Sequence, residues 1–229
     1  MTLDWVSAIL ANPDLRRMGH AQRAQDGNLG LGWLYYALAR VARPKRAVCI
    51  GSWRGFVPIV LGQALRDNGE GGRLTFIDPS LVDDFWADAQ RTREWFASFG
   101  LDNVEHHRLT TQQFVGSEAN RALGEIGLLF VDGYHTAEQA RFDHQAFVDR
   151  LADDAFVLFH DSIRPRSSKM YGEERRYTHD VYEYMEELKR RPELQVMDFP
   201  ADSGVTLVRR VARTASDQPR ASPGAPSAA

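Results

Sequence analysis

Five short apolar runs recur between residues 46 and 161 of this 229-residue chain, and a segment of helical length separates each run from the next. Continuous apolar runs are typical of strands that are buried on both faces, and the segments between them can cross over such a sheet as helices. The alternation therefore predicts a mainly parallel sheet with helices on both faces. The runs are RAVCIG (46–51), RLTFID (73–78), VEHHRL (104–109), IGLLFVD (126–132) and AFVLFHD (155–161).

Two further strand-like runs follow a different rule, because only PADS separates LQVMDF (194–199) from GVTLVRR (204–210). A connection this short cannot contain a crossover helix, so the two runs must pair antiparallel as a hairpin. The prediction is an α/β fold with a Rossmann-like, doubly wound, seven-stranded sheet, which is mostly parallel and has an antiparallel C-terminal hairpin strand.

Apolar residues at helical spacing predict three helices around the sheet. The first covers 57–65, where Pro58 is tolerated because the first turn of a helix leaves its N–H groups unpaired. The second covers 137–151, and the third covers 181–188 with Thr178 as its N-cap.

The chain is expected to form one domain with a flanking segment at each end. LGWLYYALARVA (31–42) predicts a helix that packs across the sheet edge or over the site, and residues 1–45 as a whole are expected to form a helical segment on the core of residues 46–212. Residues 213–229 contain no large apolar side chain, so they cannot offset the entropy of ordering and are expected to form a loose tail.

Composition limits the classes of partner. The net charge of −3 gives no general attraction to nucleic acid or to an anionic membrane, and no apolar run approaches the roughly 20 residues of a membrane span. The single cysteine, Cys49, is expected to be a buried strand residue and fits a reducing compartment, and the N-terminus lacks the basic region of a signal peptide. We therefore expect a cytoplasmic protein, whose partners have to be inferred from a site.

The first strand ends in IGSWRG (50–55), where a ligand site of the sheet is expected. Gly51 would let a ligand approach the backbone, and Gly55 would allow the turn into the helix. The spacing lacks the third glycine of a dinucleotide fingerprint, and Trp53 and Arg54 are bulky for a loop that holds a pyrophosphate. The motif therefore argues against an NAD-dependent dehydrogenase.

The second strand ends in Asp78, which is placed to accept hydrogen bonds from both hydroxyls of a ribose. A purely structural interpretation is also open, in which Asp78 caps a helix with Pro79 at its first position. Together with the preceding glycine turn, the carboxylate favours an adenosine-containing ligand.

The fourth and fifth strands end in Asp132, followed by His135, and in His160–Asp161. A carboxylate after a buried strand must be solvated, hydrogen-bonded or bound to a cation, and two converging carboxylates suit magnesium better than zinc. Two other functions stay open: a non-haem iron oxygenase that uses Asp132, His135 and His160, and a non-catalytic module that binds a nucleoside.

FVDGYHTAEQARFD followed by DDAFVLFHDS resembles the class I S-adenosylmethionine-dependent methyltransferases, in particular the small bacterial group near macrolide-sugar O-methyltransferases and, more distantly, the catechol type. The resemblance covers roughly residues 28 to 210. It implies S-adenosylmethionine and a divalent metal ion, chiefly magnesium, as cofactors. It also implies methylation of a hydroxyl on a sugar or phenol-like small molecule, and association into a homo-oligomer.

The resemblance also implies which residues contact the cofactor. The glycine-rich motif would pass beneath the methionine part, the acid after the second strand would bind the ribose, and the loop after the third strand would meet the adenine. The implied contacts are Gly51, Ser52, Gly55, Asp78, Thr110, Thr111 and Gln112, together with Asp132.

On the reaction side, Asp132 and Asp161 match metal-binding positions of the family, and His135 matches the general base of the sugar enzymes. The sugar enzymes have two adjacent acids where this chain has His160–Asp161, and the catechol type has Asp-Asn where it has Asp161–Ser162. If His160 replaces a carboxylate ligand, the preference shifts toward a softer ion such as manganese or iron.

The insert SIRPRSSKMYGEERRYTHD (162–180) is locally basic. It is either a solvated surface loop or a lid that recognises an anionic substrate through phosphate or carboxylate groups. Its charged residues are Arg164, Arg166, Lys169, Arg175 and Arg176 against Glu173, Glu174 and Asp180.

Overall fold

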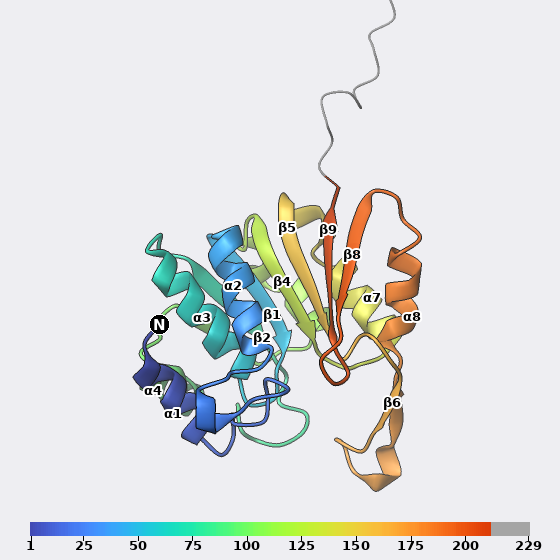
Figure 1. Cartoon of the computed structure of the whole chain (residues 1–229). Coiled ribbons are helices and arrows are strands. Elements are labelled where there is room, and N and C mark those ends of the chain that lie inside the picture. The colour runs from blue at the N-terminus through green and yellow to red at the C-terminus, as the bar shows by residue number, and fades with distance from the viewer. Residues whose placement is uncertain (212–229) are drawn as a thin grey trace, which may run out of the picture.

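The computed structural model describes residues 1–211 and contains one seven-stranded sheet (Figure 1). Its strand order is β3-β2-β1-β4-β5-β9-β8; the first five strands of the chain are parallel, and β9 is antiparallel to both of its neighbours. The predicted fold class is therefore confirmed. The strands are β1 (Arg46–Gly51), β2 (Arg73–Ile77), β3 (Val104–His107), β4 (Ile126–Asp132), β5 (Leu151–His160), β8 (Leu194–Phe199) and β9 (Val205–Arg210).

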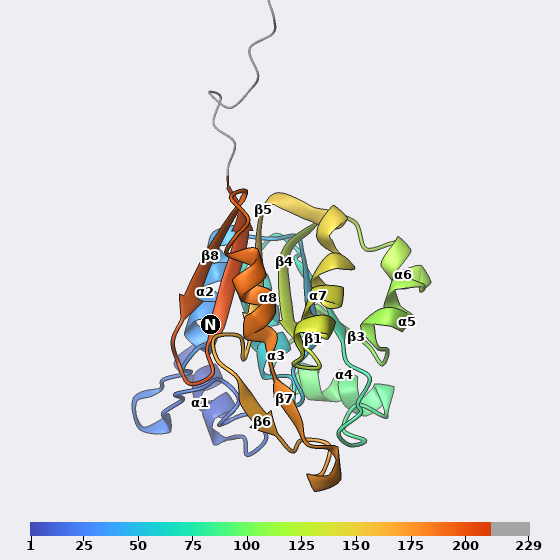
Figure 2. The same ribbon diagram turned by 90° about the vertical axis from the view of Figure 1, so that its right-hand side faces the viewer.

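Helices cover both faces of the sheet (Figure 2). One face packs against α1 (Leu3–Ala11), α2 (Gly32–Ala42), α3 (Phe56–Asn68) and α4 (Ala89–Ser98). The other face packs against α5 (Thr111–Val115), α7 (Ala137–Gln145) and α8 (Val181–Leu188), and a short helix α6 (Glu118–Arg121) follows α5.

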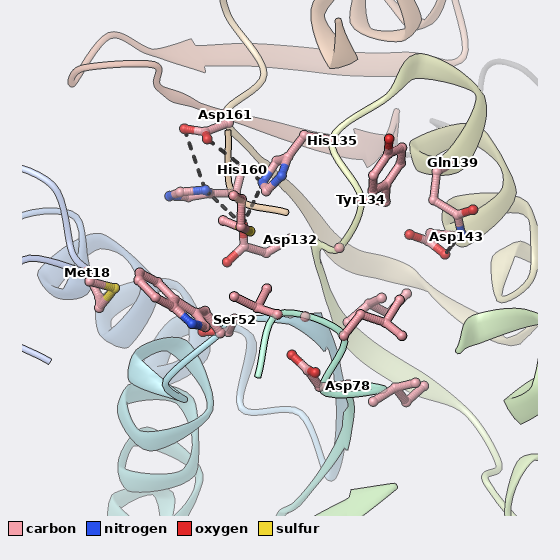
Figure 3. A pocket seen from close by; sticks show the side chains of 18 of the residues that line it. Met18, Ser52, Asp78, Asp132, Tyr134, His135, Gln139, Asp143, His160 and Asp161 are labelled. Carbon is pink, nitrogen blue, oxygen red and sulfur yellow. Dashed lines mark hydrogen bonds and ion pairs between the residues drawn. The ribbon is translucent and has the colours of Figure 1, made fainter. Parts of the chain in front are cut away.

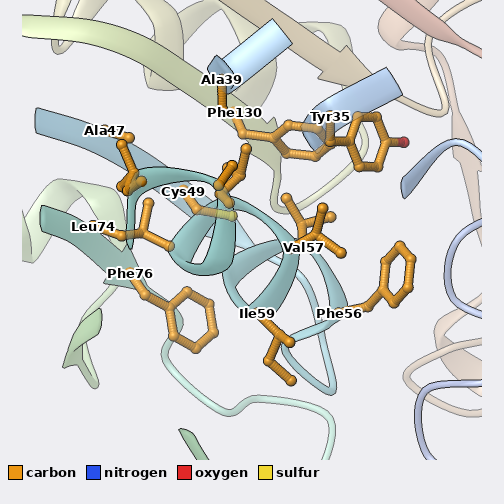
Figure 4. Packing of buried hydrophobic residues seen from close by; sticks show 14 of the residues in the cluster. Tyr35, Ala39, Ala47, Cys49, Phe56, Val57, Ile59, Leu74, Phe76 and Phe130 are labelled. Carbon is orange, nitrogen blue, oxygen red and sulfur yellow. The ribbon is translucent and has the colours of Figure 1, made fainter. Parts of the chain in front are cut away.

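Side-chain alternation along β1 produces two apolar cores. Ala47 and Cys49 point into the core beneath α2 and α3 (Figure 4), while Val48 and Ile50 point into the core beneath α7 and α8. Cys49 is fully buried, which confirms the expectation for this residue. Strands that are apolar on both sides are stable only between two helical layers, so the alternation of runs in the sequence specifies this sandwich.

The helices predicted over 31–42 and 57–65 are present as α2 and α3. The position expected for the first was wrong, because α2 packs against α3, β4 and β5 and so covers a face of the sheet. The helix predicted over 137–151 was too long, since it ends at Gln145 and the chain turns through Val148–Arg150 into a longer β5.

A small hairpin of β6 (Arg166–Ser168) and β7 (Tyr177–His179) lies within the basic insert and was not predicted. Thr178 belongs to β7, so its assignment as N-cap of α8 was wrong, and Asp180 occupies that position. The hairpin projects at the same end of the sheet as the N-terminal segment (Figures 1 and 2).

The tail predicted over 213–229 lies outside the described residues. Within residues 1–211, no helix combines the length and the hydropathy that a membrane crossing requires.

Candidate active site

A cavity of about 650 Å³ opens at the carboxyl ends of the parallel strands (Figure 3). It lies where β1 and β4 are neighbours and the strand order reverses, the position at which open α/β sheets bind ligands. Every sequence-predicted site residue lines it except Gly55, which precedes α3 as its N-cap residue. The lining residues that were predicted are Gly51, Ser52, Asp78, Thr110, Thr111, Gln112, Asp132, His135, His160 and Asp161.

The turn after β1 is held in an unusual backbone conformation. Gly51 has φ +74°, and a Cβ atom on it would lie 2.0 Å from the carbonyl oxygen of Asp132. Ser52 and Trp53 also have positive φ values, of +112° and +33°, which residues other than glycine rarely adopt. Such strain persists only where the surroundings fix it, and it is common at ligand sites. The contact with β4 therefore requires glycine at position 51.

Asp78 follows β2 as a buried carboxylate on the cavity wall. Its Oδ1 accepts a hydrogen bond of 2.7 Å from the backbone N–H of Ser80. Burial raises the pKa of Asp78 to about 6, although the Ser80 hydrogen bond partly opposes the shift. No helix begins at Pro79, because the next helix is α4 with Asp88 as its N-cap, so the alternative of a helix cap was wrong.

The loop after β3 forms the next part of the wall. Thr110 and Gln113 form a capping box, in which Gln113 Oε1 accepts from the Thr110 N–H at 2.9 Å and Thr110 Oγ1 accepts from the Gln113 N–H at 3.2 Å. The box fixes the backbone of Thr111 and Gln112 beside the cavity.

Asp143 of α7 also lines the cavity and was not predicted from the sequence (Figure 3). It is 1% exposed, and its Oδ1 accepts a hydrogen bond of 2.8 Å from Gln139 Nε2. Burial raises the pKa of Asp143 to about 6, against the effect of hydrogen bonds from Thr111 and Gln139. The only sequence signal for Asp143 is its position four residues after Gln139 in a predicted helix, a spacing that places the two side chains on the same face.

Asp132, at the end of β4, contacts two histidines through the same oxygen. His135 Nε2 lies 3.0 Å and His160 Nδ1 lies 2.9 Å from Asp132 Oδ1. Burial would raise the pKa of Asp132, but the His160 charge and the His135 hydrogen bond outweigh it and hold that pKa well below its usual range. Burial would likewise lower the pKa of His160, yet Asp132 and Asp161 raise it to about 9.

Asp161, which directly follows β5, is 2% exposed and has φ +50°. Its Oδ2 lies 2.8 Å from Arg166 Nη2 and 3.2 Å from His179 Nδ1, both of which come from the β6–β7 hairpin. Burial opposes ionisation of this carboxyl, but the contact with His179 and the charges of His160, His135 and Arg166 hold the pKa of Asp161 well below its usual range.

Two histidines at this site were missed because they are distant in sequence from the strand ends. His179 is fully buried and stacks on His135, and His20 from the segment before α2 places its Nε2 3.8 Å from Asp161 Oδ1. His179 lies in the insert of residues 162–180, whose only distinctive sequence feature is its basic charge. No sequence pattern around His20 indicates that it belongs to the site.

The donor set fits a divalent metal ion. Three groups of residues share members and could each hold a metal ion. Within each group, the carboxylate and imidazole ligand atoms all lie within 4.8 Å of one another. Among the described residues, Asp161 Oδ1 is buried without a hydrogen-bond partner, and His160 Nδ1 contacts Asp132 Oδ1 at 2.9 Å but outside good hydrogen-bond geometry. Buried polar atoms without well-formed hydrogen bonds are costly, so these two fit ligands of an ion better than structural groups. The groups are His20–His160–Asp161, Asp132–His135–His160 and His135–Asp161–His179.

Most of the charges of the basic insert are paired within the chain. Lys169 and Arg176 contact Glu173, Arg164 contacts Asp202, and Arg166 contacts Asp161. This pairing supports the solvated-loop interpretation for most of the insert. Of the five basic residues, only Arg166 lines the cavity.

The family described as "Methyltransferase domain" matches residues 48–162, which include the turn after β1, Asp78 and the ends of β4 and β5. The uncharacterized protein y4gI of Sinorhizobium fredii is 25% identical over 193 residues, which make up 82% of this chain and 19% of that protein. The chain thus spans about a fifth of the length of the curated relative it matches.

Solved methyltransferases share the fold over nearly the whole chain. The O-methyltransferase TomG of Streptomyces achromogenes, solved with SAM, has a TM-score of 0.61 at 18% identity and covers 92% of this chain and 89% of its own. An O-methyltransferase of Bacillus cereus, solved with SAH, has a TM-score of 0.62 at 14% identity and covers 90% of this chain and 91% of its own.

Proposed function

The chain belongs to the methyltransferase domain family, and on that premise we propose that it uses S-adenosylmethionine to methylate a hydroxyl oxygen of a small molecule, with the help of a divalent metal ion. One observation carries this proposal: Asp78 and the pair Asp132–His135 line the same cavity, at the ends of β2 and β4. A carboxylate suited to a ribose and an acid–base pair suited to a hydroxyl therefore face one ligand space.

In this proposal the cofactor lies along the β1 side of the cavity. The Asp78 carboxylate accepts hydrogen bonds from the ribose hydroxyls, since only one bond to it, from Ser80, occurs within residues 1–211. Gly51 and Ser52 line the methionine part, and the backbone from Thr110 to Gln112, fixed by the capping box, lines the adenine. The solved structures with SAM and SAH support this arrangement by their fold.

His135 is the proposed general base. S-adenosylmethionine supplies an electrophilic methyl group when it is bound, so the acceptor hydroxyl must lose its proton as it attacks. His135 Nε2 lies 3.0 Å from Asp132 Oδ1, and because a carboxylate only accepts hydrogen bonds, Nε2 carries the proton of the neutral ring. The lone pair is then on Nδ1, which has no hydrogen-bond partner among the described residues and can take the proton of the hydroxyl. The hydrogen bond from Nε2–H to Asp132 Oδ1 stabilises the charged ring that results.

Asp132, His160 and Asp161 are the proposed residues around a divalent metal ion, for which magnesium was the first expectation. Such an ion would stabilise the negative charge that develops on the hydroxyl oxygen. Its presence is supported by Asp161 Oδ1, which accepts no hydrogen bond within residues 1–211, and by His160 Nδ1, whose 2.9 Å contact with Asp132 Oδ1 lacks good hydrogen-bond geometry. Asp132 also borders the cofactor side, because the turn at Gly51 packs on its carbonyl oxygen.

The proposed acceptor is a sugar or phenol-like ring. Tyr134 and Tyr171 line the cavity, and Tyr134 stacks on Tyr177 with ring centroids 4.4 Å apart. Aromatic faces of this kind bind flat or weakly polar rings. An anionic group on the acceptor would meet Arg16 and Arg17, which also line the cavity, rather than the internally paired insert.

Two alternatives receive less support. Asp132, His135 and His160 do lie together, as an iron oxygenase requires, but Asp78 and the strained turn would then have no task. A non-catalytic nucleoside module would leave the His135–Asp132 pair without a role. A cytoplasmic location and a homo-oligomer remain proposals that follow from composition and from the resemblance.

Isothermal titration calorimetry with S-adenosylmethionine tests the proposal. We expect binding with and without magnesium, and a loss of about 10-fold or more in affinity for Asp78→Ala, because each hydrogen bond to a charged group contributes about 1.5–3 kcal/mol. Asp102→Asn, an exposed carboxylate outside the cavity, is the matched control. Absence of binding at high micromolar cofactor would overturn the proposal.

A further inference from the structure

The segment that carries His20 is fixed against the cavity by its backbone. His20 and Ala21 have φ values of +44° and +51°, and the Leu31 N–H donates a 2.7 Å hydrogen bond to the Gly19 carbonyl oxygen. A Cβ atom at Gly30 would lie 1.6 Å from the His20 carbonyl oxygen. The backbone at Gly30 therefore approaches the backbone at His20 so closely that only glycine fits there. A conformation this constrained holds the His20 ring in one place.

The orientation of the His20 ring is set by Asp202, in the turn between β8 and β9. His20 Nδ1 lies 3.0 Å from Asp202 Oδ2, and because a carboxylate only accepts hydrogen bonds, Nδ1 carries the proton. The lone pair of a neutral ring is then on Nε2, which lies 3.8 Å from Asp161 Oδ1. A histidine whose other nitrogen donates to a carboxylate is the usual arrangement around metal ions in proteins.

Within residues 1–211, neither of the atoms that face His20 Nε2 forms a hydrogen bond of good geometry, although His160 Nδ1 lies 2.9 Å from Asp132 Oδ1. Asp161 uses Oδ2 for Arg166 and His179, while within residues 1–211 its Oδ1 accepts no hydrogen bond. His160 Nδ1 lies 3.7 Å from that Oδ1. Separations of 3.7 and 3.8 Å are too long for hydrogen bonds. They are close to the about 3.4 Å between two ligands that each bind one tetrahedral ion at about 2.1 Å.

We propose that His20 Nε2, His160 Nδ1 and Asp161 Oδ1 form a transition-metal site that selects imidazole-binding ions over magnesium. Two nitrogen donors and one oxygen donor suit zinc, iron, cobalt or nickel, whereas magnesium takes oxygen ligands. The inference rests on the proposed function for the presence of a metal ion. It changes the expected ion, and in place of Asp132 it uses His20, a ligand from outside the matched family region of residues 48–162.

This ligand set also separates the tasks of the histidines. None of the three atoms belongs to His135, so His135 keeps the hydrogen bond from its Nε2–H to Asp132 Oδ1 at 3.0 Å, and its Nδ1 stays available for proton transfer. The site joins the segment before α2, the end of β5 and, through Asp202, the β8–β9 turn. Binding of the ion therefore stabilises contacts between parts of the chain that are far apart in sequence.

The test measures metal binding by the full-length, metal-free protein without any cofactor. Calorimetry with Co²⁺ and with Mg²⁺ alone gives the selectivity, and the visible spectrum of the Co²⁺ complex reports nitrogen ligation. We expect one Co²⁺ per chain, bound at least 100-fold more tightly than Mg²⁺, and a rise in thermal midpoint on binding. His20→Ala should weaken Co²⁺ binding at least 10-fold, and Asp202→Asn about 10-fold.

His107→Ala is the matched control, because His107 is also partly buried but does not line the cavity. It should bind Co²⁺ as the natural chain does. Equal affinity for Mg²⁺ and Co²⁺, or unchanged Co²⁺ binding in both His20→Ala and Asp202→Asn, overturns the proposal. Calorimetry with S-adenosylmethionine on the same metal-free samples is independent of this result, so failure of the metal site and failure of the proposed function are distinguishable.

Discussion

The imidazole ring of His179 lies flat against that of His135, with ring centroids 4.3 Å apart and planes 7° from parallel. His179 is fully buried, and its Nδ1 lies 3.2 Å from Asp161 Oδ2. The hairpin between β5 and α8 therefore positions the proposed general base through a ring contact, without a hydrogen bond to it.

This contact predicts a specific kinetic change. His179→Ala removes the surface on which His135 rests, so kcat is expected to fall about 10-fold, a scale typical of groups that position a catalytic residue. His179→Phe keeps a flat ring and is expected to recover most of the rate. The measurement is methyl transfer to an acceptor found by screening sugars and phenols. A fall in cofactor affinity with unchanged kcat would contradict the positioning role.

Asp78 is expected to lower the stability of the ligand-free chain and to strengthen the binding of S-adenosylmethionine. Its native pKa of about 6 lies above the ordinary aspartate value of 3.8, so its contribution to stability is present at low pH and is lost as pH rises through 6. Asp78→Asn removes this cost and is expected to stabilise the ligand-free chain by about 1–3 kcal/mol at pH 8. The same change should weaken S-adenosylmethionine binding. Thermal unfolding and calorimetry, with Asp102→Asn as reference, measure both effects.

His144 makes stability depend on pH in the opposite direction. Burial lowers its pKa from 6.5 to about 4, and nearby Arg191 and Arg210 add to the shift. The unfolded chain therefore binds the proton more readily, and stability is lost as pH falls below 6.5, by about 2 kcal/mol at pH 5 from this group. His144→Gln should flatten the urea midpoint between pH 7 and 5. An unchanged slope would show that other groups cause the acid loss.

Gly51 is expected to tolerate no side chain. Gly51→Ala combines a φ of +74° with a Cβ atom 2.0 Å from the Asp132 carbonyl oxygen. The expected loss is about 2–5 kcal/mol, from left-handed backbone strain and steric overlap together. Gly69→Ala is the matched control, because Gly69 has φ +72° but nothing within 4 Å of the added Cβ, and it should lose about 1–2 kcal/mol. Urea unfolding compares the two; equal losses would refute the steric part.

The sheet and one half of the site could be predicted from the sequence because local patterns specify them. Apolar runs reveal buried strands, and the residues that end adjacent parallel strands must meet at one edge, which brought Asp132 and Asp161 together in the prediction. The short PADS connection likewise left only a hairpin. These inferences need no knowledge of how the loops run.

The other half of the site depends on loop paths that no periodicity encodes. His20 reaches Asp161 because two residues of its loop adopt positive φ. Asp202 contacts His20 although the two residues are far apart in the sequence. The strands that carry Arg166 and His179 are short and polar, so they lack the apolar alternation that reveals other strands. Contacts between such segments are tertiary and follow only from the three-dimensional structure.

At Gly51, the turn after β1 packs directly against the carbonyl oxygen of Asp132 at the end of β4, with no room for a side chain between them. An adjustment of the turn when a ligand enters is therefore expected to shift Asp132, and with it the oxygen shared by His135 and His160. In the proposed function, this backbone contact couples the cofactor on the turn to the acceptor beside His135. We expect the coupling to appear in kinetics as a compulsory order of binding, in which the cofactor binds before the acceptor.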